Sequence, residues 1–85
     1  MGKTKRPYPR KLARKLKQIR TKLRLSQSQI AKQLGVKDRA SISVYENGQR
    51  EPPLPVLLEY ARLAKVPVET LIDDRLGLPK KPVGR

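Results

Sequence analysis

Apolar side chains recur through the middle of the chain at steps of three and four residues, which is the spacing of one face of a helix. Five such sets occur, and each predicts a short helix. They are Leu12, Leu16, Ile19 and Leu23; Ile30, Ala31 and Leu34; Ile42 and Tyr45; Leu54, Leu57, Leu58, Ala61 and Ala64; and Val68, Leu71 and Ile72. No segment shows the sustained alternation of a strand. The pattern therefore predicts an all-α fold, a compact bundle of five short helices, the first over residues 10–23.

Residues that begin and end helices separate the second and third sets. Ser26 precedes Gln29 by three residues, as in a capping box. Gly35 stands where the second helix should end in a left-handed conformation, and Asp38 offers a cap for the third. The Asn-Gly pair at 47–48 favours a turn after it. We therefore expect two short helices joined by a tight turn between residues 27 and 46.

The charge of the chain is strongly positive and uneven. Lys and Arg number 21 against 7 acidic residues, a net charge of +14 that suits a polyanionic partner. Residues 1–24 hold eleven basic residues and no acidic one. Both ends of the chain combine proline with basic residues and carry few apolar ones. We divide the chain into a flexible basic arm at 1–9, a folded domain at 10–74 and a flexible tail rich in proline and lysine at 75–85.

Several functional classes fit the composition poorly. The chain has no cysteine and no histidine, so the usual zinc sites, thiol chemistry and the commonest general base are missing. We expect no enzyme, no metal and no cofactor. With no Phe or Trp and three Tyr, stacking of single-stranded RNA bases is disfavoured. No apolar run is long enough to span a membrane, so the expected location is the cytoplasm, on the nucleoid.

The segments LSQSQIAKQLG at 25–35 and ISVYENG at 42–48 resemble the helix-turn-helix of the Cro and phage-repressor (XRE) family. REPPLPVLL at 50–58 and AKVPVETL at 64–71 are similar to the two helices that follow it in that family. The resemblance implies a lambda-repressor-like DNA-binding domain and a sequence-specific regulator of transcription. Among such regulators, a repressor is expected. The resemblance also implies that the third helix reads the major groove of double-stranded DNA.

Residue roles follow from helix geometry and from this resemblance. Four small or apolar residues are expected to pack the motif: Ala31, Gly35, Ile42 and Tyr45. The outer face of the third helix leaves four candidates for base contacts: Arg39, Ala40, Ser43 and Val44. Expected phosphate contacts are Gln27, Lys37, Asn47 and Arg50, joined by Lys3, Lys5 and Arg6 of the arm. The family also implies an ion pair between Arg20 and Glu46. For Arg39, a phosphate contact is the alternative to guanine recognition.

One departure from the family pattern affects these roles. Gly35 and Ile42 are seven residues apart, where six is usual. The longer turn shifts the start of the third helix relative to the second, and Arg39 is the candidate most affected.

Partners and alternatives remain open at this stage. Family members commonly bind palindromic operators as homodimers, and four apolar residues near the C-terminus form a candidate interface or simply close the core: Leu71, Ile72, Leu76 and Leu78. The same fold also occurs in antitoxins, which bind a toxin through a C-terminal segment, and in coactivator-type adaptors, which bind protein instead of reading DNA.

Overall fold

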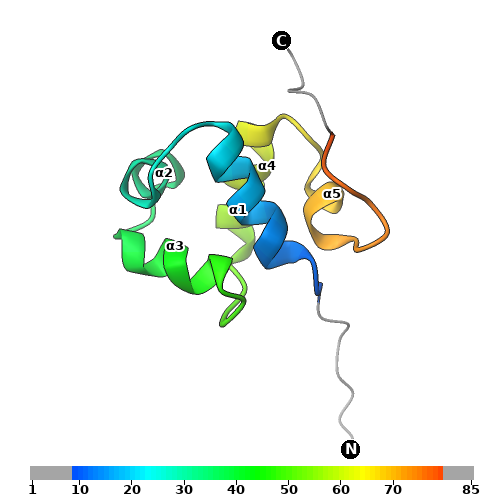
Figure 1. Cartoon of the computed structure of the whole chain (residues 1–85), viewed down its shortest axis with the longest axis horizontal. Coiled ribbons are helices and arrows are strands. Elements are labelled where there is room, and N and C mark those ends of the chain that lie inside the picture. Colours follow the sequence, from blue (N-terminus) through cyan, green and yellow to red (C-terminus); the bar gives the residue numbers. More distant parts are fainter. Residues whose placement is uncertain (1–8, 80–85) are drawn as a thin grey trace, which may run out of the picture.

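The computed structural model describes residues 9–79 and places five helices there in chain order (Figure 1). They are α1 (Leu12–Lys22), α2 (Gln27–Leu34), α3 (Arg39–Glu46), α4 (Leu54–Ala64) and α5 (Val68–Ile72). The described residues contain no strand. The predicted all-α bundle is therefore confirmed, and the ends of α1 lie within two residues of the predicted 10–23.

The caps of α2 and α3 follow the predictions from the sequence. The Ser26 hydroxyl accepts a hydrogen bond from Gln29 N at 3.0 Å, and Ser26 N donates to Gln29 Oε1 at 2.8 Å, which completes the capping box. The α2 helix ends at Gly35, whose φ of 71° is left-handed. The Asp38 carboxylate accepts from Ser41 N at the start of α3. Local sequence alone therefore determines where these helices begin and end.

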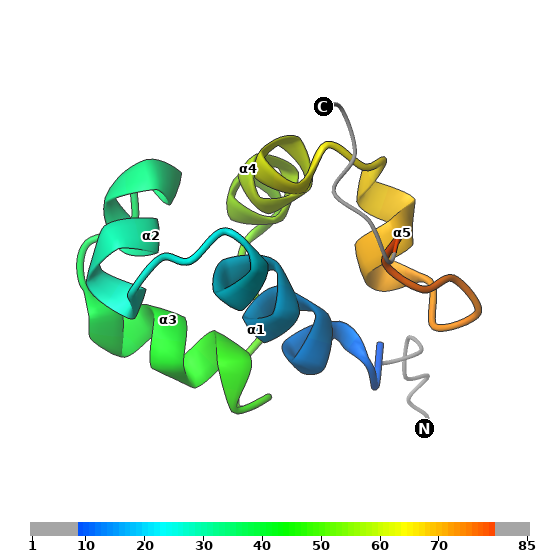
Figure 2. The same ribbon diagram turned by 45° about the horizontal axis from the view of Figure 1, so that its top comes forward.

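Helix α1 lies between the other elements and contacts α3, α4 and α5 (Figures 1 and 2). The largest fully buried side chains come from all five helices: Leu16, Ile30, Ile42, Tyr60 and Leu71. The prediction that Leu23 belongs to the buried face of the first helix is wrong. Leu23 is 39% exposed, because α1 ends at Lys22 and the chain turns through Arg24 with a φ of 60°.

Two contacts join α1 to residues far along the chain. The Asp74 carboxylate accepts hydrogen bonds from the backbone N of Arg10 at 2.9 Å and of Lys11 at 3.0 Å. These donors belong to the turn directly before α1, a helix that has no cap from the side chain of its own N-cap residue. The Lys15 side chain is buried, and its Nζ donates to the carbonyls of Thr70 at 2.7 Å and Asp73 at 3.0 Å. Helix α5 is thus fastened to α1 by polar contacts as well as by packing.

The first residues of the predicted tail lie along α1. Leu78 is partly buried against the core, and Lys22 Nζ donates to the Pro79 carbonyl at 2.8 Å. The division into arm, domain and tail stays a prediction, since most of the arm and tail lies outside the described residues. Within residues 9–79, no helix combines the length and the apolar character needed to span a bilayer.

Candidate nucleic-acid interface

Helices α2 and α3 pack directly against each other and are joined by the turn at residues 35–38 (Figure 2). Ala31 is buried where the two helices meet, and its carbonyl accepts from Val36 N at 2.9 Å as the chain leaves α2. Ile42 and Tyr45 are buried on the inner face of α3. The longer turn is accommodated before α3, because Asp38 caps the helix and Arg39 is its first residue.

The four candidates for base contacts lie on the part of α3 that is turned away from the core. Arg39 and Ala40 are exposed, whereas Ser43 and Val44 are half-buried. Ser43 Oγ also accepts a hydrogen bond from Asn47 Nδ2 at 3.4 Å. The four residues therefore lie along one side of α3, two at its start and two in its second turn.

The ion pair implied by the family is present between Arg20 of α1 and Glu46 at the end of α3. Arg20 Nε donates to Glu46 Oε2 at 2.7 Å, and Nη2 donates to Oε1 at 3.1 Å. The side chains are only 15% and 3% exposed, respectively. The hydrogen bond to Glu46 raises the pKa of the Arg20 guanidinium. Arg20 Nη1 donates to the Leu25 carbonyl at 3.0 Å, so the guanidinium holds α1, the loop before α2, and α3 together.

The candidates for phosphate contacts lie around α3. Gln27 is the first residue of α2, and its Nε2 donates to Glu46 Oε1 at 3.3 Å, which adds it to the ion-pair network. Lys37 is exposed in the turn before α3, and Asn47 and Arg50 are exposed after it. Lys3, Lys5 and Arg6 lie outside the described residues.

The buried Tyr60 of α4 was not singled out by the sequence. It is fully buried, and its hydroxyl has no hydrogen-bond partner among the described residues. Burial is the main reason that the pKa of this phenol is raised, and Glu46 and Tyr45 raise it further. Since Tyr60 stands three residues after Leu57 and next to Ala61, its place on the apolar face of α4 was available as a signal.

The acidic residues at 73 and 74 make contacts within the fold. Asp73 Oδ2 lies 3.0 Å from Arg75 Nη2, and this hydrogen-bonded pairing lowers the pKa of Asp73 to about 2. Asp74 accepts hydrogen bonds from the backbone N of Lys11 and Arg10, just before α1, and these bonds lower the pKa of Asp74. Over residues 9–79, no group of His, Cys, Asp or Glu side chains is arranged to hold a metal ion.

This arrangement, a capped helix pair with an exposed second helix in a basic chain, defines a DNA-binding domain of the helix-turn-helix class. The chain belongs to the helix-turn-helix family, because the model of that family, described as Helix-turn-helix, matches residues 16–71. It is of the XRE type to which Cro and the phage repressors belong, so the resemblance seen in the sequence is confirmed.

A comparison with solved structures agrees with this assignment. The fold is similar to that of the P22 c2 repressor, solved in complex with a synthetic operator in the presence of Tl⁺. The TM-score is 0.68 at 24% sequence identity, and the match covers 74% of this chain and 94% of the repressor chain. This likeness confirms the lambda-repressor-like fold. Among curated proteins, none matches the chain.

Proposed function

We propose that the chain is a transcriptional repressor without catalytic activity that recognises a specific sequence of double-stranded DNA by placing α3 in the major groove. The observation that carries this proposal is the outer face of α3. It presents exposed Arg39 and Ala40 beside Ser43 and Val44, and the buried pair of Arg20 and Glu46 fixes the helix to the scaffold. Family membership supports the same conclusion.

Each residue on that face has a distinct role in this proposal. Arg39 donates two hydrogen bonds to a guanine, and a good bidentate contact of this kind discriminates by about 1 to 3 kcal/mol. Ser43 donates or accepts one hydrogen bond, and Val44 packs on a thymine methyl. Ala40 lets the helix backbone approach the base edges closely. With one strong reader per subunit, the remaining specificity comes from DNA shape and from a second subunit.

The phosphate contacts position α3 in this proposal. Gln27 lies at the amino end of α2, where unpaired backbone N–H groups favour an anion. Lys37, Asn47 and Arg50 grip the backbone on either side of α3. Lys3, Lys5 and Arg6 add contacts from the arm.

We propose that the repressor binds a palindromic operator on the nucleoid as a homodimer. Of the four apolar residues considered for an interface, Leu71 is fully buried and Leu78 is partly buried, so both serve the core. Ile72 and Leu76 are each 42% exposed and remain available to a second copy. Sedimentation at several protein concentrations tests this, and a mass that stays monomeric with and without operator contradicts it.

The recognition proposal is tested by enriching a random duplex library for bound sequences at near-physiological salt. We expect a palindromic motif that binds much more tightly than scrambled duplex. Arg39→Gln should weaken binding to the enriched site by about tenfold, within the 1 to 3 kcal/mol of a bidentate contact, and relax preference at one base pair. Lys32→Gln, a matched loss of charge on the exposed side of α2, is the control.

Three outcomes contradict the proposal in different ways. Salt-sensitive binding without sequence preference excludes a specific regulator. Absence of duplex binding favours the adaptor. A motif bound only together with a protein captured by the C-terminal region favours the antitoxin.

The arm is tested separately by removing residues 1–8, which leaves the buried Pro9 in place. Each neutralised phosphate contributes about 0.9 to the slope of log affinity against log salt, so the loss of three contacts should reduce the slope by about 2.7. An unchanged slope shows that the arm does not contact DNA.

A further inference from the structure

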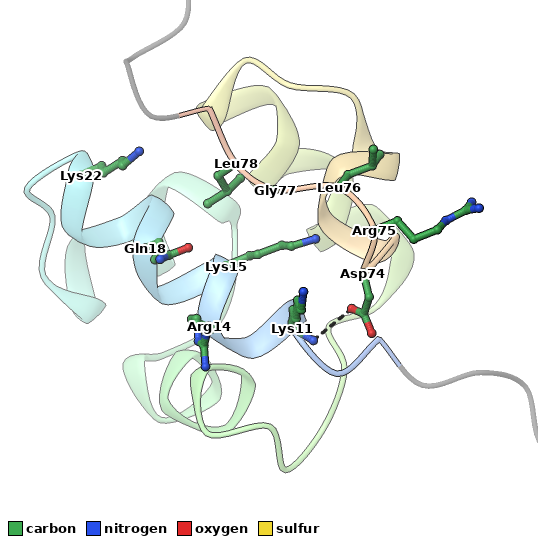
Figure 3. Close-up of a pocket in the computed structure, with 10 residues that line it drawn as sticks. All are labelled: Lys11, Arg14, Lys15, Gln18, Lys22, Asp74, Arg75, Leu76, Gly77 and Leu78. Carbon is green, nitrogen blue, oxygen red and sulfur yellow. Dashed lines mark hydrogen bonds between the residues drawn. The ribbon is translucent and has the colours of Figure 1, made fainter.

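A pocket of about 360 Å³ lies between α1 and the segment at 74–78 (Figure 3). Helix α3 packs on another side of α1, so the pocket and the proposed DNA-reading face are separate surfaces (Figures 1 and 3). Its volume falls at the lower end of the range for small-molecule sites. Leu76 and Leu78 contribute apolar wall, and most of the polar lining comes from α1.

The side chains that line the pocket carry an excess of positive charge. Four cations come from α1 and the residue before it: Lys11, Arg14, Lys15 and Lys22. The carboxylate in the lining is that of Asp74, and both of its oxygens already accept hydrogen bonds from the backbone of Arg10 and Lys11, just before α1. Arg75 also lines the pocket, but its charge is paired with Asp73. The lining therefore holds more positively than negatively charged side chains.

Lys15 distinguishes this pocket from an ordinary basic surface. Its side chain is 3% exposed and extends from α1 toward the 74–78 segment (Figure 3). An ammonium group has three donors, and two of them are used by the carbonyls of Thr70 and Asp73. Burial lowers the pKa of Lys15, with opposing contributions from Asp74 and Asp73. A buried cation held mainly by neutral carbonyls is stabilised further when an anion reaches it.

We propose that this pocket binds a small organic phosphate monoester, whose phosphate group lies beside Lys11 and Lys15 and whose organic part packs against Leu78. Phosphate fits the site because it offers several strong acceptor oxygens to the Lys11 and Lys15 ammonium groups, which lie on the same side of α1 (Figure 3). The apolar wall favours an organic phosphate over the inorganic ion. The inference concerns a second site and does not require that α3 read DNA.

Binding is tested with the full chain by following backbone amide shifts during titration with phenyl phosphate and, separately, with inorganic phosphate. Ionic strength is held constant with sodium chloride. We expect saturable shifts in residues 10–22 and 74–79, with tighter binding of phenyl phosphate. Shifts that stay linear with concentration, or that sodium chloride alone reproduces, show charge screening only and overturn the proposal.

Matched variants locate the site. Lys11→Gln alters an exposed side chain and should weaken phenyl phosphate binding about tenfold, which is the scale of one charge-assisted hydrogen bond. Lys17→Gln removes the same charge from the same helix outside the pocket and should change the affinity less than about twofold. Equal weakening by Lys17→Gln overturns the proposal.

A duplex DNA titration separates the two sources of phosphate. If duplex shifts the amides of α3 and leaves residues 74–79 unaffected, the pocket is distinct from the DNA site. If duplex causes saturable amide shifts in residues 74–79 and phenyl phosphate does not bind, the pocket contacts the DNA backbone and the small-ligand proposal fails. Loss of duplex binding alone leaves the phenyl phosphate result standing, so the two proposals fail independently.

Discussion

Helix α1 is fastened on two sides by two of its own cations, and the two attachments differ in kind. Toward α3, Arg20 forms a two-point ion pair with the nearly buried carboxylate of Glu46. Toward α5, Lys15 donates to two main-chain carbonyls, at Thr70 and Asp73. The contact with α3 therefore needs a particular side chain on each helix. The contact with α5 needs only the lysine and the main-chain carbonyls at the end of α5.

This difference has consequences for orientation. A guanidinium and a carboxylate that share two parallel hydrogen bonds fix both distance and angle, which suits a helix whose exposed face must be aimed. An ammonium group bonded to carbonyls holds a helix end in place and tolerates rotation about the contact. The contact with α3 thus fixes the orientation of the helix but depends on both side chains. The contact with α5 allows more variation in orientation.

The sharpest test of this comparison is Glu46→Ala, which strands the buried Arg20 and leaves Gln27 Nε2 without its acceptor. Removing one partner of a buried pair costs about 3 kcal/mol or more, so we expect a loss of that size in the free energy of unfolding measured with urea. Glu46→Gln keeps an acceptor oxygen and should lose less. Equal losses for the two variants would mean that the negative charge of Glu46, and not the geometry of its hydrogen bonds, stabilises the contact, which contradicts an orienting role for those hydrogen bonds.

On the α5 side, Lys15→Met keeps the length of the side chain and removes its donors. Leaving two carbonyls without this partner should cost about 2 kcal/mol of unfolding free energy, partly offset because no charge is then buried. Lys17→Met, on the exposed surface of the same helix, should change it by less than about 0.5 kcal/mol. A Lys15→Met loss as large as that of Glu46→Ala means that the two attachments are equivalent.

The ends of the helices extend the comparison at a smaller scale. Near α3, α2 ends at glycine with a φ of 71°, whereas α4, which leads to α5, ends at Lys65 with a φ of 60°. A left-handed residue with a side chain costs about 1 kcal/mol relative to glycine. Lys65→Gly should raise the midpoint of thermal unfolding by a few degrees, and Gly35→Ala should lower it. No gain in Lys65→Gly would show that the lysine side chain makes a compensating contact.

The smallest expected effect concerns acid. Hydrogen bonds from the backbone of Lys11 and Arg10 lower the pKa of Asp74 in the folded state. The stabilisation is therefore complete above about pH 4, the unfolded value, and is lost as the pH falls through the lower folded value. Asp74→Asn should flatten this acid-dependent loss and lower stability slightly at neutral pH. Unfolding free energies measured from neutral to acid pH check this, and parallel curves for the two proteins contradict it.

Local sequence was sufficient to predict those features of the fold in which a residue acts on its own helix. Ser26, Gly35 and Asp38 predicted the limits of α2 and α3, because caps act within four residues of the chain. The periodicity predicted the burial of Ile30, Leu34 and Ile42 for the same reason. The family resemblance supplied the contact between Arg20 and Glu46, which spacing alone does not reveal.

Contacts between distant segments were not predictable in the same way. The sequence does not show that Asp74 accepts hydrogen bonds from the turn before α1, more than 60 residues away. Lys15 stands beside Leu16 on the edge of the apolar face, where a lysine normally extends into solvent, and only the carbonyls of α5 explain its burial. Leu23 was placed in the core because its spacing is correct, although the helix has already ended.

The capping of α1 by Asp74 also bears on the order in which the chain folds during synthesis. Helices α2 and α3 find their caps within their own segments, so the residues that set their ends are all present once each segment has left the ribosome. The turn before α1 is synthesised early, but the Asp74 carboxylate that accepts its hydrogen bonds emerges only after α5. In a nascent chain stalled before residue 74, the beginning of α1 would therefore be frayed. Chaperones and proteases would act on that end of the chain first.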